Sequence, residues 1–229
     1  MTGTVSHLLI AMVVFIFSHI AMSSLPVRTL IIQKIGKQKF KGLYSLITIA
    51  EMSWVITAYN NAPAEIYWKP HNAFKHLTLS LMLITIISII AALTPINSDE
   101  RTDGPQGIYR VTRHPMIWGI ALWSTTHVLA NGELYALIFF GGLTVLALAG
   151  TVQVNRRKAC LEGNIWQAYA AKGSHIPFAA ILAKRTHFSA KKIGCLPVIL
   201  GIIIYLVLLI LHETVIGIAA ISRVSGLFD

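Results

Sequence analysis

Six runs of apolar residues, each close to the length that crosses a bilayer, constrain the fold of this chain more than any other feature. They occupy residues 7–25, 43–59, 74–93, 115–130, 134–152 and 196–220. A transmembrane helix needs about 20 mostly apolar residues, and shorter runs adapt through tilt and flanking residues. Hydrophobic residues make up 55% of the chain and charged residues 12%, with a mean hydropathy of +0.67. We therefore predict an all-α, polytopic bundle of about six transmembrane helices that forms a single domain over residues 1–229.

The basic residues alternate between successive loops and predict the topology. Residues 26–42, 94–114 and 153–195 carry sixteen of the nineteen Lys and Arg residues. The positive-inside rule then places these loops in the cytoplasm and both termini on the exoplasmic side, as in a multi-pass protein of the bacterial inner (cytoplasmic) membrane. The net charge of +10 follows from this bias. The lipid bilayer is thus the expected partner, and nucleic acid is not required to explain the charge.

The long basic segment before the last apolar run contains two aromatic residues, Trp166 and Tyr169. Their basic surroundings are typical of an interfacial helix that lies on the membrane. A solvated connector with aromatic anchors explains the same pattern equally well. Cys160 and Cys195 are the only cysteines, and no C-x-x-C-H haem-attachment or C-x-x-C zinc motif occurs.

The stretch around the fourth apolar run organises the chain. Pro115 suits the first position of a helix, and Asn131-Gly132 predicts a left-handed exit from it. Arg113 and His114 then lie at the helix N-terminus, where unpaired N–H groups favour an anion, so we expect an anion-binding site or polar clamp there. An interfacial role for Arg113 and a capping role for His114 remain open. His127 lies thirteen residues further along, about 20 Å away at the helical rise.

Polar residues within apolar runs are costly in hydrocarbon and usually face a partner. Glu51, His19, His127 and His212 lie within such runs, and His76 lies near the start of another. One intramembrane histidine most often makes an interhelical hydrogen bond, whereas several on different helices favour metal or haem ligation. Intramembrane cysteines and Asp/Glu-x-x-His patterns are absent from the sequence, so haem fits better than zinc or di-iron.

Four blocks of sequence resemble the NnrU family of denitrification-associated membrane proteins, which is related to the plant zeta-carotene isomerases. The blocks are His19-x-x-x-x-Ser24-Leu-Pro-x-Arg28, Gly107-Ile-x-Arg-x-x-Arg-His-Pro-x-x-Trp-Gly119, Leu122-Trp-x-x-x-His127-x-x-x-Asn131-Gly132 and His212-x-x-x-x-Gly217. The two central blocks together are specific, whereas Arg-His-Pro alone also occurs in isoprenylcysteine carboxyl methyltransferases and membrane sterol reductases. The resemblance covers nearly the whole chain.

The resemblance implies a cofactor and its ligands. The isomerase relatives bind haem b through two histidines, which correspond by position to His19 and His127. Counting along the helices places His212 nearer than His19 to the depth of His127, so His212 is the reserve for the second ligand. Trp123 and Asn131, one turn to either side of His127, are expected to pack on its ring and anchor the helix end.

Two functions of different classes remain open. The first is a haem b protein, either a redox-gated isomerase of an apolar, lipid-soluble substrate or an accessory in nitrogen-oxide respiration. The second is an S-adenosylmethionine-dependent methyltransferase of the isoprenylcysteine type, in which Arg113 and His114 would hold the ligand carboxylate. Those enzymes have paired acidic residues after their fifth helix, whereas this chain has Arg156-Arg157-Lys158 and a lone Glu162. That departure counts against the methyltransferase.

Overall fold

The described part of the chain is built from α-helices, as the apolar runs predict. The computed structural model describes residues 3–94, 104–218 and 220. In chain order the helices are α1 (Val5–Ser23), α2 (Leu25–Ile35), α3 (Lys37–Asn60), α4 (Asn72–Leu93), α5 (Pro115–Ala130), α6 (Leu134–Lys172), α7 (Ala179–Leu182) and α8 (Cys195–Ile216). The predicted all-α bundle is therefore confirmed. Two basic residues that entered the topology argument, Arg101 and Arg223, lie outside the described residues.

Four of these helices, α1, α4, α6 and α8, are long and apolar enough to cross a membrane, counted over the described residues. This makes the chain a multi-pass membrane protein. Helix α5 has only 16 residues, and α3 carries several charged residues in its first turns. The predicted total of six crossings therefore stays a prediction, as does the exoplasmic position of both termini.

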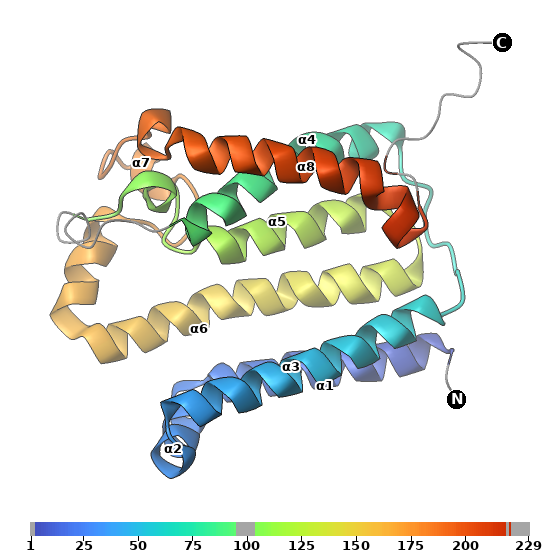
Figure 1. Cartoon of the computed structure of the whole chain (residues 1–229), viewed down its shortest axis with the longest axis horizontal. Helices are drawn as coiled ribbons and strands as arrows, with labels where there is room; N and C mark the ends of the chain where they lie inside the picture. The colour runs from blue at the N-terminus through green and yellow to red at the C-terminus, as the bar shows by residue number, and fades with distance from the viewer. Residues whose placement is uncertain (1–2, 95–103, 219, 221–229) are drawn as a thin grey trace.

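Helix α6 lies in the middle of the bundle and contacts α5 on one side and α1 on the other. Helix α3 packs on α1, while α4 packs on α5 and α8 packs on α4 (Figure 1). Successive long helices run in opposite directions. We call the end of the bundle where α1, α4 and α6 end and α3, α5 and α8 begin the basic end; it lies on the left of Figure 1.

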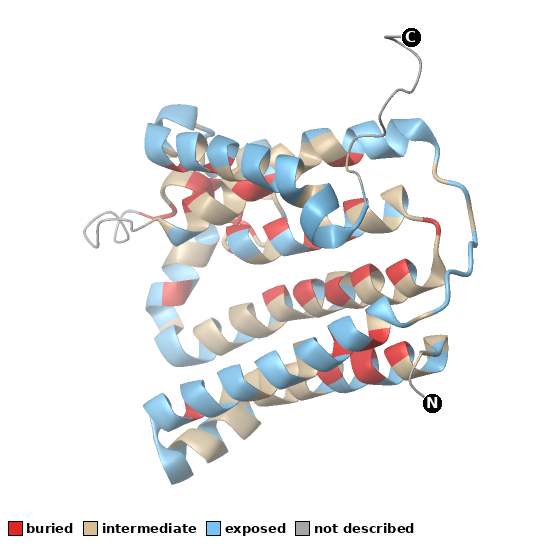
Figure 2. Ribbon diagram, turned by 45° about the vertical axis from the view of Figure 1, so that its right-hand side comes forward, coloured by how far each residue is buried: buried red, intermediate tan, exposed pale blue. Residues whose placement is uncertain are grey.

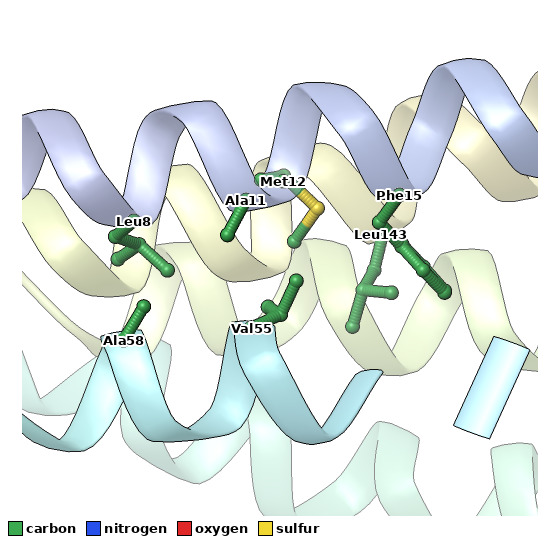
Figure 3. Packing of buried hydrophobic residues seen from close by; sticks show 7 residues of the cluster. All are labelled: Leu8, Ala11, Met12, Phe15, Val55, Ala58 and Leu143. Carbon is green, nitrogen blue, oxygen red and sulfur yellow. The ribbon is translucent and has the colours of Figure 1, made fainter. Parts of the chain in front are cut away.

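Apolar side chains between α1, α3 and α6 form the main buried cluster. Its members are Leu8, Ala11, Met12, Phe15, Val55, Ala58 and Leu143 (Figure 3). Buried residues line the facing sides of these helices, and their outer sides are exposed (Figure 2). In a bilayer the exposed apolar surface contacts lipid chains, so helices associate mainly through close packing and hydrogen bonds.

Glycines permit the closest helix contacts. A Cβ atom on Gly119 of α5 would lie 2.6 Å from Cγ1 of Ile89 on α4, and one on Gly201 of α8 would lie 2.6 Å from Cγ1 of Ile87. Small residues at such positions let helix backbones approach each other in membranes. Gly119 closes the Arg-His-Pro-x-x-Trp-Gly block, so this part of the motif serves helix packing.

Helix α5 begins at Pro115 as predicted, but its exit differs from the prediction. Asn131 has an extended backbone (φ −118°, ψ 139°), and Gly132 is not among the residues with positive φ. The predicted left-handed exit is therefore wrong. Gly132 is needed for space instead, because the carbonyl oxygen of Trp68 lies where a Cβ atom would stand. The Gly132 carbonyl also accepts a 2.8 Å hydrogen bond from the amide of Tyr67.

Helix α6 continues about twenty residues beyond the predicted run, to Lys172. Gly163 interrupts it with a non-helical backbone (φ 51°, ψ −124°) that glycine adopts readily. The chain changes direction there, and the last part of α6 turns across the basic end (Figure 1).

Candidate functional site

His127 lies one turn from the end of α5, with its ring held by neighbours on α5 and α6. Its Nδ1 atom lies 2.8 Å from the carbonyl oxygen of Trp123, which can only accept, so Nδ1 carries the proton. The ring contacts Trp123 (5.3 Å between centroids) and Phe140 of α6 (4.8 Å). Asn131 donates to the His127 carbonyl at 2.7 Å and thus closes the helix end. The Nε2 atom of His127 has no hydrogen bond to any described residue.

His212, near the end of α8, shows the same arrangement. Its Nδ1 atom donates to the carbonyl oxygen of Ile218 at 2.6 Å. Its Nε2 atom likewise makes no hydrogen bond within the described ranges. His212 is close enough to His127 for the two imidazoles to interact electrostatically. The tertiary structure therefore brings His127 and His212 to the same region of the bundle.

His19 lies elsewhere, between α1 and α3. Its ring contacts Phe15 (5.5 Å) and Tyr44 (5.0 Å), and its buried Nδ1 atom has no hydrogen-bond partner. The adjacent Ser18 donates a 2.6 Å hydrogen bond to the carboxylate of Glu51. Glu51 is thus satisfied by α1, as expected for an acidic residue in an apolar helix.

The positions along α6 that each histidine region contacts show how far His19 lies from His127. His127 packs on Phe140, whereas the carbonyl of Ile20, next to His19, accepts a 2.8 Å hydrogen bond from Gln153. Phe140 and Gln153 are thirteen residues apart, about 20 Å at the helical rise. Among the described residues, no ring contact or hydrogen bond joins the two histidines. The structure does not bring the expected pair, His19 and His127, together.

Arg113 and His114 form a second cluster, at the basic end. The guanidinium of Arg113 lies over the ring of Trp166, 5.5 Å from its centroid, and donates to the carbonyl of Ala170 at 3.1 Å. Arg113 therefore satisfies a carbonyl in the last turn of α6. His114 is only 5% exposed, and its side chain makes no capping bond to α5. Trp166 is also buried, so it packs inside the protein and is not the interfacial anchor that its sequence context indicated.

Burial and positive neighbours keep His114 neutral. Burial lowers the pKa of His114 to about 4, and the nearby His175 and Arg113 act in the same direction. The pKa of His175 is also lowered, first by burial and then by Arg113. Asn155 of α6 contacts His114 and favours its charged form, but it does not offset the other effects.

Sequence reasoning missed His175, Asn155 and Lys158 as neighbours of the Arg-His-Pro corner. Thr151, Asn155 and Lys158 are spaced three to four residues apart, so they lie on one face of α6. This polar stripe in the sequence could have indicated that α6 contributes residues to the Arg-His-Pro corner. The spacing of residues in the sequence did not indicate that His175, in the segment after α6, lies beside His114.

A haem could be held by His127, near the end of α5, and His212, near the end of α8, because each has one imidazole nitrogen without a hydrogen bond among the described residues. Metal-binding histidines usually donate their other N–H to a carbonyl or carboxylate, as His127 and His212 do here. Over the described residues, no group of three or more His, Cys, Asp or Glu side chains could hold a metal ion.

Comparison with known proteins identifies a matching family and two similar proteins. Residues 7–220 match the family described as "NnrU protein". The chain is 37% identical over 79 residues to the 15-cis-zeta-carotene isomerase, chloroplastic, of Arabidopsis thaliana and 34% identical over 79 residues to that of Zea mays. Each match covers 34% of this chain and 22% of the relative, and no solved structure matches. The methyltransferase alternative receives no support from these matches. Because the family match spans nearly all of the sequence, the chain belongs to the NnrU family.

Proposed function

We propose that this membrane protein binds one haem b, with His127 as an axial ligand, and acts as an isomerase on an apolar substrate. The hydrogen bond from His127 Nδ1 to the Trp123 carbonyl carries the proposal. It fixes the ring and leaves Nε2 as the nitrogen available to a metal. Similarity to the zeta-carotene isomerases over 79 residues supports isomerase-like chemistry.

Two histidines are candidates for the opposite ligand. Family resemblance favours His19, whose Nδ1 is buried without a partner. His212 is favoured by its electrostatic effect on His127 and by its Nδ1, which a carbonyl holds; among the described residues no ring contact or hydrogen bond joins these two histidines either. His19 would reach His127 only if the packed cluster around Phe15 and Leu143 opened. We therefore assign the second ligand to His212 and keep His19 as the alternative that the experiment decides.

The chain's own residues would orient the cofactor and exclude water. Trp123 and Phe140 flank the His127 ring, and Asn131 holds the last turn of α5 in place. Haem iron bound here would supply Lewis-acid and one-electron redox chemistry.

The exposed apolar surface of α8 supports an apolar class of substrate. Most large side chains of α8 are exposed, for example Ile203, Leu208 and Ile210, and they face lipid in a membrane. An apolar polyene such as the carotene named for the plant relatives could reach His127 from within the bilayer. We place the protein in the bacterial inner membrane; an accessory role in nitrogen-oxide respiration would use the same haem.

The absorption spectrum of the purified protein tests this proposal. We expect a Soret band and a b-type pyridine haemochrome, with or without added haem. His127→Ala should lose haem or convert it from low to high spin, whereas His76→Ala, at an exposed histidine of α4, should not. Far-ultraviolet circular dichroism checks that each variant keeps its helices.

The second ligand is decided by two further variants. His212→Ala should alter the spectrum as His127→Ala does, and His19→Ala should leave it unchanged. The reverse result assigns the ligand to His19. A wild-type protein that stays colourless with excess haem, or an unchanged spectrum in His127→Ala, contradicts the proposal.

A further inference from the structure

A cavity of about 550 Å³ lies at the basic end, away from His127. Its walls come from the part of α6 around the Gly163 interruption and from the segment that begins at Gly104. Lys158, Glu162 and Trp166 of α6 line it. The change of direction at Gly163 turns the end of α6 across the bundle and so gives the cavity its wall.

Trp166 is one of the residues that line the cavity, but neighbouring side chains cover its ring. Arg113 and Lys158 both lie over its ring, at 5.5 Å and 4.8 Å from the centroid, and the His114 ring is 6.5 Å away. Trp166 is 4% exposed. Arg113 and His114 contact Trp166 but do not line the cavity themselves.

Opposite charges line the cavity without pairing. Lys158 and Glu162 are one helical turn apart on α6, a spacing that normally permits an ion pair. Within the described part of the chain they form none, and neither has a hydrogen bond to a side chain there. Lys172 also lines the cavity. The Lys158 ammonium and the Glu162 carboxylate are therefore both available to a ligand that carries the complementary charges.

The part of α6 that lines the cavity also carries exposed apolar side chains. Leu161 and Ile165, on the same part of α6, are 68% and 78% exposed, and Leu182 of the nearby α7 is 81% exposed. Large exposed apolar side chains among basic residues are typical of a surface in contact with the membrane interface. Ile165 also lines the cavity, so an apolar tail can leave it toward lipid.

We propose that this cavity binds a phosphoethanolamine group, with Lys158 on the phosphate and Glu162 on the ammonium. Phosphate favours a lysine as a point charge. The carboxylate of Glu162 can accept charge-assisted hydrogen bonds from an ammonium. The source is either the head group of phosphatidylethanolamine or the free phosphoethanolamine; both carry the same two charges.

Thermal unfolding of the full chain in lipid nanodiscs distinguishes the sources. We expect a higher midpoint in phosphatidylethanolamine than in phosphatidylcholine, whose methylated ammonium cannot donate to Glu162. A higher midpoint in phosphatidylcholine on adding free phosphoethanolamine would identify the soluble source. Equal midpoints under all three conditions overturn the proposal. So does an equal increase with phosphatidylglycerol, because that lipid lacks the ammonium.

Three variants test the contacts. Lys158→Gln should weaken the lipid effect roughly tenfold in apparent affinity, the loss expected for one charge-assisted hydrogen bond. Glu162→Gln should abolish the preference for phosphatidylethanolamine over phosphatidylglycerol. Arg156→Gln removes an exposed charge from the same helix outside the cavity and should change nothing. Equal effects of Lys158→Gln and Arg156→Gln contradict the site, and Glu162→Gln decides the matter if Lys158→Gln does not fold.

Discussion

The imidazole rings of His114 and His175 meet edge to face, with 5.6 Å between their centroids. Backbone and side-chain bonds hold the two segments together. The amide of Arg113 donates to the Ser174 carbonyl at 2.8 Å, and Trp118 Nε1 donates to the His175 carbonyl at 2.8 Å. The Arg-His-Pro corner is therefore bonded to the segment that follows α6, and it organises the basic end of the bundle.

The burial of His114 predicts a pH-dependent stability, to which the neighbouring His175 adds. Because the pKa of folded His114 is about 4 and its ordinary value is 6.5, the unfolded chain binds an extra proton between these values. The free energy of unfolding should fall as the pH drops from about 6.5 to about 4 and level off below. Denaturation in mild detergent at a series of pH values measures this free energy of unfolding. His114→Gln should flatten the curve and His76→Gln should not; an unchanged slope in His114→Gln contradicts the assignment.

The close approach of α8 to α4 predicts a cost for adding one methyl group. Gly201→Ala would place a Cβ 2.6 Å from Cγ1 and 3.0 Å from Cα of Ile87. We expect a loss of about 1–3 kcal/mol in the free energy of unfolding, typical of overpacking. Gly150→Ala is the control, because its Cβ would lie 3.9 Å from the nearest atom, Cγ2 of Ile117. That variant should be neutral or more stable by up to about 1 kcal/mol, since alanine favours helix. Equal effects of the two variants contradict the packing described.

A hydrogen bond between α4 and α5 predicts the effect of a near-isosteric change. Buried Thr78 bonds the carbonyl of Thr126 at 3.0 Å as well as a carbonyl of its own helix. Thr78→Val should lower the free energy of unfolding by about 0.6–1.7 kcal/mol, the range found for interhelical bonds in membranes. Ser80→Ala removes only an exposed bond within α4, to His76. If Ser80→Ala lowers the free energy of unfolding as much as Thr78→Val does, the interhelical hydrogen bond contributes nothing to stability.

The distribution of basic residues predicts which end of the bundle faces the cytoplasm. Both natural cysteines, Cys160 and Cys195, are exposed at the basic end. In intact cells an impermeant maleimide should leave them unlabelled. A cysteine at the exposed position of Glu65, between α3 and α4, should be labelled when both natural cysteines are replaced by alanine. Labelling of Cys160 but not of the cysteine at position 65 would reverse the topology.

Sequence alone determined the local features of this protein. The apolar runs indicate helices because lipid leaves a spanning backbone no other way to satisfy its hydrogen bonds. Helix α5 begins at Pro115 and ends before Asn131 because these residues act within one turn of the chain. The contact between Trp123 and His127 follows from their i,i+4 spacing.

Only the tertiary structure decided which distant residues meet. Gly132 is explained by the Trp68 carbonyl on another loop, and Trp166 is buried because α6 changes direction at Gly163. The neighbour of His127 depends on how α8 packs against the rest of the bundle. Counting along the helices already placed His212 nearer than His19 to the depth of His127, but it could not show which helices are adjacent. Such contacts arise from packing between segments tens of residues apart, which a periodic pattern within one segment does not encode.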